Sequence, residues 1–141
     1  MSVYAESSAV LSWLLDEGTA AEIRRLLAAA DFIITSDLTL IECDRVLLRA
    51  VAVGELTEAE GADRRAHLVM AASHWHVLRI APEIVDRARQ SFPGEPIRSL
   101  DAIHLASALI ARSAMAGLGL LSLDDRVRRA GVRLGLSVLP I

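Results

Sequence analysis

Five short, mostly apolar runs, each separated from the next by segments with helical periodicity, constrain the fold of this chain most strongly. They cover residues 3–5, 32–35, 76–80, 118–123 and 136–139. Runs this short and this apolar are typical of strands that are buried on both faces, as in parallel sheets. Strands that alternate with helices form βαβ units. The sequence therefore predicts an α/β fold built on a central, mostly parallel sheet of four to five strands.

The intervening segments carry the residues that begin and end helices. Thr19–Glu22 and Thr57–Glu60 both fit the capping-box pattern, and Pro82 is suited to a first helical position. Gly54 is expected to end a helix that starts at residue 36 or 37, and Ser99 is a natural N-cap for a later one. These signals predict at least one helix between every two consecutive strands.

The bulk properties indicate one ordinary folded domain that spans residues 1–141. The chain has 141 residues, of which 53% are hydrophobic, and one cysteine, Cys43. A single cysteine excludes an internal disulfide framework and a cysteine-based zinc site. Neither a signal peptide nor a membrane span is recognisable, so we expect a cytoplasmic protein without a membrane partner. The net charge of −3 does not indicate a nucleic-acid-binding protein, but a local arginine patch could still bind one.

The helix expected over Arg98–Arg112 is apolar almost throughout, and Asp101 is its only acidic residue. A carboxylate in the first turn is favoured by the helix dipole, so Asp101 could be a structural cap. His104 and Ser107 continue the same polar stripe at intervals of three residues, which favours a cleft instead. On these residues alone, a structural cap and a site carboxylate are equally good interpretations.

Three further carboxylates stand at places where a parallel sheet forms its ligand crevice. Glu6 follows the first strand, Asp124 follows the fourth, and Glu42 has apolar neighbours one turn away on either side. Each acid alone could be a helix cap or a surface charge. In open α/β sheets, however, ligands bind beyond the carboxyl ends of the strands, so the acids could converge there.

Converging carboxylates would repel one another unless a divalent cation lay among them. Oxygen ligands without cysteine suit hard ions such as Mg²⁺ or Mn²⁺. Such an ion can polarise a phosphoryl oxygen and lower the pKa of a bound water. An oxidoreductase that uses a dinucleotide is excluded, because no Gly-x-Gly-x-x-Gly follows the first strand.

Four segments of the chain resemble the PIN-domain family, and most closely its VapC-type toxins. Tyr4–Ala9 is similar to the opening segment of the family, which usually carries Asp followed by Thr-Ser-Ala, and Leu40–Glu42 is similar to its second acidic segment. Ser99–Ala106 is the most specific match and contains the third acid. Leu121–Asp124 resembles the closing Thr-x-Asp motif and favours Asp124 over Asp125 as the fourth acid.

The resemblance implies a three-layer α/β/α sandwich with metal-dependent endoribonuclease activity, which acts as the toxin of a toxin–antitoxin pair. The implied partners are an RNA substrate, a cognate antitoxin and a second copy in a homodimer, and the implied cofactor is Mg²⁺ or Mn²⁺. Metal binding and catalysis are then assigned to Glu6, Glu42, Asp101 and Asp124. Glu6 replaces the usual Asp, which leaves a noncatalytic module that binds RNA or a peptide in the same crevice as the alternative.

Several other residues are candidates for supporting roles. Ser8 and Ser122 could hydrogen-bond the carboxylates or a scissile phosphate, although serine after a strand is more often an N-cap. His104 is more simply a satisfied core histidine, and His74–His76 more simply packs at a turn. Phosphates beside the cleaved bond could be held by basic residues, namely Arg98, Arg126, Arg129 and Arg133.

Overall fold

The strands form one parallel sheet. The structure, a computed structural model, describes residues 1–141. The strand order is β3-β2-β1-β4-β5, and every neighbouring pair is parallel. The strands are β1 (Val3–Ala5), β2 (Ile33–Ser36), β3 (His76–Leu78), β4 (Gly119–Leu121) and β5 (Ser137–Leu139). All five apolar runs therefore form strands, and the prediction of a central parallel sheet is confirmed.

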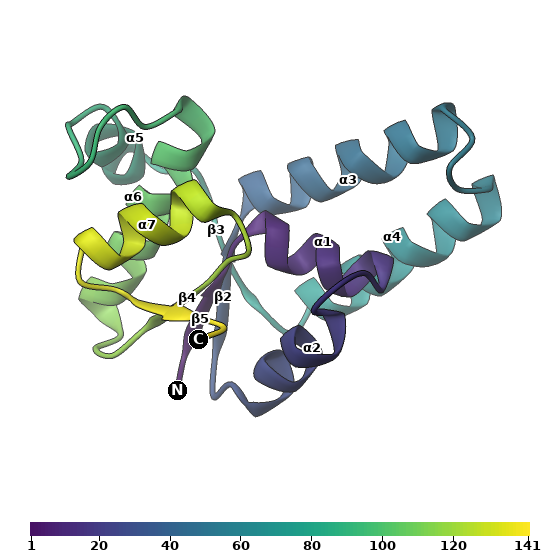
Figure 1. The fold of residues 1–141 in the computed structure, drawn as a ribbon, viewed down its shortest axis with the longest axis horizontal. Coiled ribbons are helices and arrows are strands. Elements are labelled where there is room, and N and C mark those ends of the chain that lie inside the picture. The colour runs from purple at the N-terminus through teal and green to yellow at the C-terminus, as the bar shows by residue number, and fades with distance from the viewer.

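The helices cover both faces of the sheet, so the expected three-layer α/β/α arrangement is also confirmed. In Figure 1, α5, α6 and α7 lie on one side of the strands and α1 to α4 on the other, with α3 and α4 projecting beyond the sheet as a pair. No helix is both long and apolar enough to span a membrane. The bounds are α1 (Ser7–Leu15), α2 (Ala20–Ala29), α3 (Asp37–Ala52), α4 (Glu58–Ala72), α5 (Pro82–Ala88), α6 (Ser99–Ala114) and α7 (Asp125–Arg133).

The alternation of side chains along β1 divides the core in two. Tyr4 points into the cluster that α6 and α7 form with one face of the sheet, and it is fully buried there. Val3 and Ala5 point into the cluster on the other face, which includes residues of α1, α2, α3 and α4. Because successive strand side chains alternate between faces, β1 contributes to both clusters. This central position fixes the residue that follows β1, Glu6, at the middle of the sheet edge.

Two helix starts differ from the prediction. Ser99 is the first residue of α6, and Arg98 occupies the N-cap position without a side-chain bond to the helix. Thr19 is the N-cap of α2, but its side chain makes no capping bond, so the predicted capping box at Thr19–Glu22 is wrong. Its backbone, at φ −85° and ψ 20°, is not in the extended region that usually aims an N-cap side chain at the helix. The capping box at Thr57–Glu60 is present as predicted.

Candidate active site

The candidate site lies at the carboxyl edge of the sheet, where the direction of strand addition reverses. From β1 the chain adds β2 and β3 on one side, and then returns to add β4 and β5 on the other. Helices α1, α3, α6 and α7 begin at this edge, so their N–H-rich ends face it. Such ends favour negative charge. The four predicted acids all come from these helices or from the residues just before them.

Glu6 is held almost out of solvent by two serines. Its carboxylate Oε2 accepts hydrogen bonds from the Ser8 backbone N–H (3.2 Å), from the Ser8 hydroxyl and from the Ser122 hydroxyl (2.8 Å). The Glu6 residue is only 5% exposed. Its other oxygen, Oε1, makes no hydrogen bond and lies 3.9 Å from His104 Nε2. Only two fully buried side-chain polar atoms lack a hydrogen-bond partner, Thr39 Oγ1 and Arg64 Nε. Glu6 Oε1 also lacks a partner but is not one of these two atoms, so it is in contact with solvent.

Glu42, in the second turn of α3, is fixed by a histidine and a serine from two other helices. His104 Nε2 lies 2.5 Å from Glu42 Oε1, and the Ser7 hydroxyl donates to the same oxygen at 2.7 Å. Burial acts to raise the pKa of Glu42, but the hydrogen bonds from His104 and Ser7 outweigh it and hold that pKa below its usual value. Glu42 is therefore an ionised carboxylate with Oε2 left free.

Tyr4 sets the orientation of the His104 ring. The Tyr4 hydroxyl lies 2.9 Å from His104 Nδ1, and both residues are buried. Burial raises the pKa of Tyr4, so its hydroxyl stays protonated and can donate to Nδ1. The Nε2 atom then carries the ring proton and donates it to Glu42, a tautomer that we assign from the hydrogen-bond partners. A chain of polar contacts thus runs from the buried face of β1 to Glu42.

Asp124 is the N-cap of α7, and Ser8 ties it to Glu6. Asp124 Oδ1 accepts from the backbone N–H groups of Arg126 (2.9 Å) and Val127 (3.0 Å). The Asp124 N–H donates to the Ser8 hydroxyl at 3.1 Å and to the Ser122 hydroxyl at 3.2 Å. The two serines therefore contact the Glu6 carboxylate and the turn that carries Asp124 at the same time. Asp124 Oδ2 makes no hydrogen bond, and Asp125 is exposed.

Asp101 lies in the first turn of α6, one turn before His104. Its Oδ2 pairs with Arg98 Nε at 3.4 Å, and its side chain is only 13% exposed, whereas that of Arg98 is 65% exposed. Asp101 Oδ1 is free, and no bond joins Asp101 to the other three acids. Ser107, which continues the predicted stripe, is fully buried and donates to the Ile103 carbonyl. The stripe therefore turns into the core instead of lining a cleft.

The structure brings the four acids to one edge but not into contact. Glu6 and Glu42 both approach His104, Glu6 and Asp124 share Ser8, and Asp101 stands apart with Arg98. No three His, Cys, Asp or Glu side chains are grouped closely enough to hold a metal ion in this arrangement. Each acid nevertheless keeps one carboxylate oxygen without a hydrogen bond. Free carboxylate oxygens are the donors that Mg²⁺ and Mn²⁺ prefer, so the donor chemistry fits such an ion.

Sequence reasoning missed part of this site. The sequence does not indicate a role for Ser7, and it favours the interpretation of His104 as a core histidine. His104 is indeed buried and satisfied, but the group that it contacts is Glu42. A signal for His104 was present in its spacing of one helical turn from Asp101. No local pattern pointed to Ser7, because its partner Glu42 is 35 residues away.

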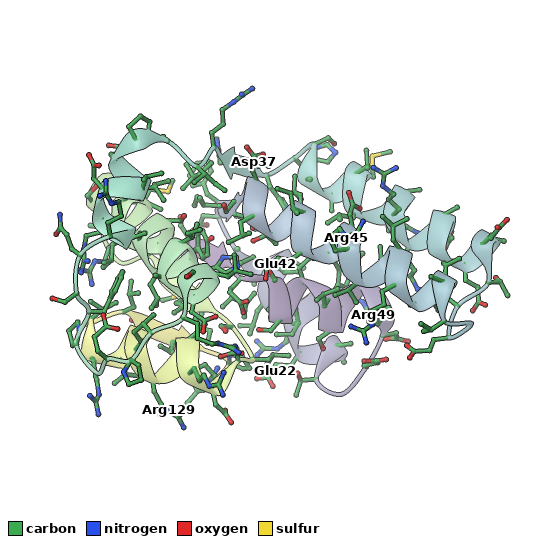
Figure 2. All side chains as sticks on the ribbon, turned by 90° about the horizontal axis from the view of Figure 1, so that it is seen from above. Glu22, Asp37, Glu42, Arg45, Arg49 and Arg129 are labelled. Carbon is green, nitrogen blue, oxygen red and sulfur yellow. The ribbon has the colours of Figure 1, made fainter.

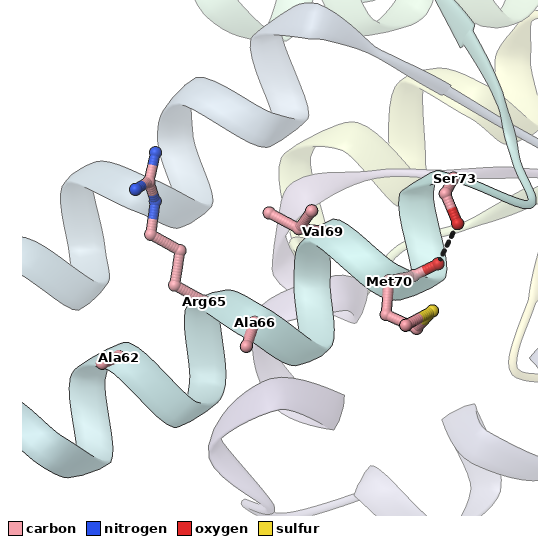
Figure 3. A pocket seen from close by; sticks show the side chains of 6 residues that line it. All are labelled: Ala62, Arg65, Ala66, Val69, Met70 and Ser73. Atoms are coloured by element: carbon pink, nitrogen blue, oxygen red, sulfur yellow. Dashed lines mark hydrogen bonds between the residues drawn. The ribbon is translucent and has the colours of Figure 1, made fainter.

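The hollow on α4 and the one cysteine add no catalytic group to the site. A depression on α4, drawn in Figure 3, has no carboxylate in its lining, which consists of Ala62, Arg65, Ala66, Val69, Met70 and Ser73. Cys43 lies on the buried face of α3, and burial raises the pKa of its thiol to about 12, so it is not a nucleophile. Neither feature is therefore an alternative to the sheet edge as the candidate active site.

Comparisons with known proteins identify the family of the chain. The family model of the PIN domain matches residues 3–132. The chain is 34% identical over 139 residues to Ribonuclease VapC46 of Mycobacterium tuberculosis, which covers 98% of this chain and 96% of the relative. It is 29% identical to Ribonuclease VapC35 of the same organism, over 97% of this chain and 85% of the relative.

Solved structures show the same fold. The VapC20 toxin of Mycobacterium tuberculosis, described as cleaving the sarcin–ricin loop, aligns with a TM-score of 0.66 at 15% identity over 92% of this chain and 95% of its own. A toxin–antitoxin complex from Klebsiella pneumoniae aligns with a TM-score of 0.64 at 20% identity over 98% and 96%. The family match, the VapC relatives and the edge-of-sheet acids agree, and the chain belongs to the PIN-domain family, among its VapC-type members.

Proposed function

We propose that this protein is a divalent-metal-dependent endoribonuclease and the toxin of a toxin–antitoxin pair. The observation that carries the proposal is the set of free carboxylate oxygens that Glu6, Glu42, Asp101 and Asp124 hold at one edge of the sheet. The relatives named as ribonucleases support the reaction class. The toxin–antitoxin complex among the structural neighbours supports an antitoxin partner.

The four acids are the residues that would hold Mg²⁺ or Mn²⁺. When bound, the ion supplies Lewis-acid polarisation of a phosphoryl oxygen and a bound water of lowered pKa. The protein's own contribution is positioning: Ser8 and Ser122 fix Glu6, and His104 and Ser7 fix Glu42. In both Glu6 and Glu42, one carboxylate oxygen is thereby fixed by hydrogen bonds, and the other remains free to bind the ion.

Glu6 supports activity in spite of its departure from the usual Asp. Its extra methylene is accommodated by three donors that hold Oε2, so Oε1 is presented from a fixed carboxylate. A longer acid that was free to rotate would be a poor ligand, because octahedral coordination by Mg²⁺ tolerates little misplacement. The noncatalytic alternative rests on this substitution and makes a different prediction in the assay below.

The test is cleavage of a cellular RNA mixture by wild type, Asp101→Asn and Asp125→Asn, in Mg²⁺, in Mn²⁺ and in EDTA. We expect wild type to cleave only with metal, and Asp101→Asn to be slower by at least about a hundredfold, since even outer-shell partners of a metal ligand are worth 10- to 100-fold. Asp125→Asn is the matched control and should cleave normally, because Asp125 is exposed and lies outside the set.

Equal cleavage by wild type and Asp101→Asn in metal would refute the proposal. Metal-independent cleavage by wild type would also refute it. RNA binding by wild type without any turnover would favour the noncatalytic module.

A further inference from the structure

Helix α7 carries four arginines, of which one is bonded to the backbone and three have no anionic partner. Arg128 is used by the fold, because its guanidinium donates to the carbonyls of Ser122 (2.7 Å), Leu139 (3.0 Å) and Pro140 (2.7 Å). Arg126, Arg129 and Arg133 are exposed, and their side chains make no hydrogen bond or ion pair. Asp125 stands one turn before Arg129 without pairing to it. Three arginines of one helix therefore lack an ion-pair partner.

These three arginines share one face of α7 and line a groove. Their spacing of three and four residues places them in a row about 10 Å long, at 1.5 Å of rise per residue. The opposite wall of the groove is the loop of residues 93–97, and the hollow has a volume of about 250 Å³. Its lining includes Pro93, Gly94, Pro96 and Ile97 together with the three arginines and Ala130.

The loop makes no ion pair with the arginines. Glu95 is the only acid in it, and both of its carboxylate oxygens are bound by the loop itself, Oε2 by the Phe92 N–H (2.9 Å) and Oε1 by the Ile97 N–H (2.6 Å). Gly94 has φ +85°, and a Cβ there would lie 2.7 Å from Arg133 Nη1. Glycine thus lets the Arg133 guanidinium lie directly against the loop backbone.

Both walls of the groove adjoin residues of the candidate active site. On the α7 wall, the Arg126 N–H donates to Asp124 Oδ1 at 2.9 Å. On the loop wall, Ile97 is followed at once by Arg98, which pairs with Asp101. A strand of RNA whose cleaved phosphate lies among the four carboxylates would be repelled by them, so it needs cations beside the site to hold it.

We propose that this arginine groove, formed by α7 and the 93–97 loop, binds backbone phosphates of the RNA strand next to the cleaved bond. The inference rests on the proposed function and assigns to it a substrate-binding surface. Arginine suits the task because its planar, always charged fork pairs bidentately with phosphate oxygens. Contacts of this kind position the strand without reading its sequence.

The experiment measures binding of a fluorescein-labelled single-stranded RNA by anisotropy, in EDTA and over a series of salt concentrations. The variants are Arg126→Gln/Arg129→Gln/Arg133→Gln and Arg129→Gln alone. The matched control is Arg49→Gln, which removes an exposed arginine that has no ion pair from α3; Figure 2 shows Arg49 far from Arg129. Because none of the three groove side chains makes a bond, we expect the variants to fold, which circular dichroism checks.

Each phosphate contact to a single strand contributes about 0.7 to the slope of log K against log salt. The magnitude of the slope should therefore fall by about 2 in the triple variant, and the affinity at low salt should fall at least about tenfold. In Arg129→Gln the magnitude of the slope should fall by about 0.7, a third of the change in the triple variant. Arg49→Gln should bind as wild type does.

Wild-type affinity and slope in the triple variant would overturn the proposal, and so would an absence of RNA binding by wild type. A triple variant that binds RNA normally but no longer binds an acidic peptide would assign the groove to a protein partner. That result would also overturn the proposal that the groove binds RNA. The binding assay requires no cleavage, so it separates the two proposals. If wild type binds RNA through these arginines but does not cleave it, the groove proposal stands and the proposed nuclease function is refuted.

Discussion

At the scale of single residues, the site depends on which oxygen of each carboxylate is occupied. Glu6 and Glu42 are each anchored through one oxygen by donors from other elements, while Asp124 is anchored by its own helix. Anchoring restricts rotation of the carboxylate and leaves its other oxygen in a defined place. A carboxylate with one bonded oxygen and one free oxygen in a fixed position is suited to bind a metal ion.

His104 is the residue whose removal most directly tests this anchoring. His104→Leu deletes a donor to Glu42, so we expect the pKa of Glu42 to rise from its depressed value toward or above the usual one. His104→Gln keeps an N–H donor and should restore part of the depression. Carbon-detected NMR titration of the glutamate carboxyl groups measures the pKa, and an unchanged pKa in His104→Leu would contradict the assigned role.

The same substitution changes the dependence of stability on pH. A carboxyl whose pKa is lower in the folded than in the unfolded protein adds stability above its unfolded-state pKa. That stability is lost as the pH falls through the folded-state pKa. Wild type should therefore lose the Glu42 contribution on acidification, and His104→Leu should lose less, as urea denaturation at a series of pH values would show.

Residue-level prediction from sequence succeeded for serines that directly follow a strand and failed for residues without such a positional signal. The positions of Ser8 and Ser122 made them candidates to bond a carboxylate, and both bond Glu6. The bonds of His104 to Tyr4 and Glu42 cross 100 and 62 residues of sequence. No strand-end or capping position marks His104 as a partner of Tyr4 or Glu42, so these contacts are visible only in the folded structure.

At the scale of elements, helix starts separate good sequence signals from misleading ones. Thr57 and Thr19 both precede a glutamate three residues later, yet only Thr57 forms the reciprocal bonds, with Thr57 Oγ1 accepting from the Glu60 N–H at 3.1 Å. The difference lies in the backbone of the N-cap residue, which is extended at Thr57 and not at Thr19. The pattern names the residues that can cap, but backbone geometry decides whether they do.

This pair gives a matched prediction for stability. Thr57→Ala should lower the free energy of unfolding by about 1 kcal/mol, because it removes a working N-cap from α4. Thr19→Ala removes no capping bond and should cost less than half as much. Urea denaturation measures both, and equal losses would show that the cap geometry is not what distinguishes the two helices.

At the scale of the whole molecule, the sheet order explains why distant acids share one edge. Placing β1 between β2 and β4 puts Glu6 beside residues that follow strands 30 and more residues away. The sequence could predict the strands, their parallel direction and the edge at which ligands bind. It could not supply the distances among the acids, because these depend on strand order and on how each helix is rotated against the sheet.

The central claim is that Glu6, Glu42, Asp101 and Asp124 act together as one metal site, although no three of them are grouped for metal binding in the structure described here. The most direct test is the affinity for Mn²⁺, read from the electron paramagnetic resonance signal of free Mn²⁺ in titrations of wild type and of single variants. The variants are Glu6→Gln, Glu42→Gln, Asp101→Asn and Asp124→Asn, with Asp125→Asn as the control. We predict that wild type and Asp125→Asn bind Mn²⁺ alike and that each of the other four variants binds at least about tenfold more weakly. Absence of Mn²⁺ binding by wild type, or wild-type affinity in Asp101→Asn, would contradict the account.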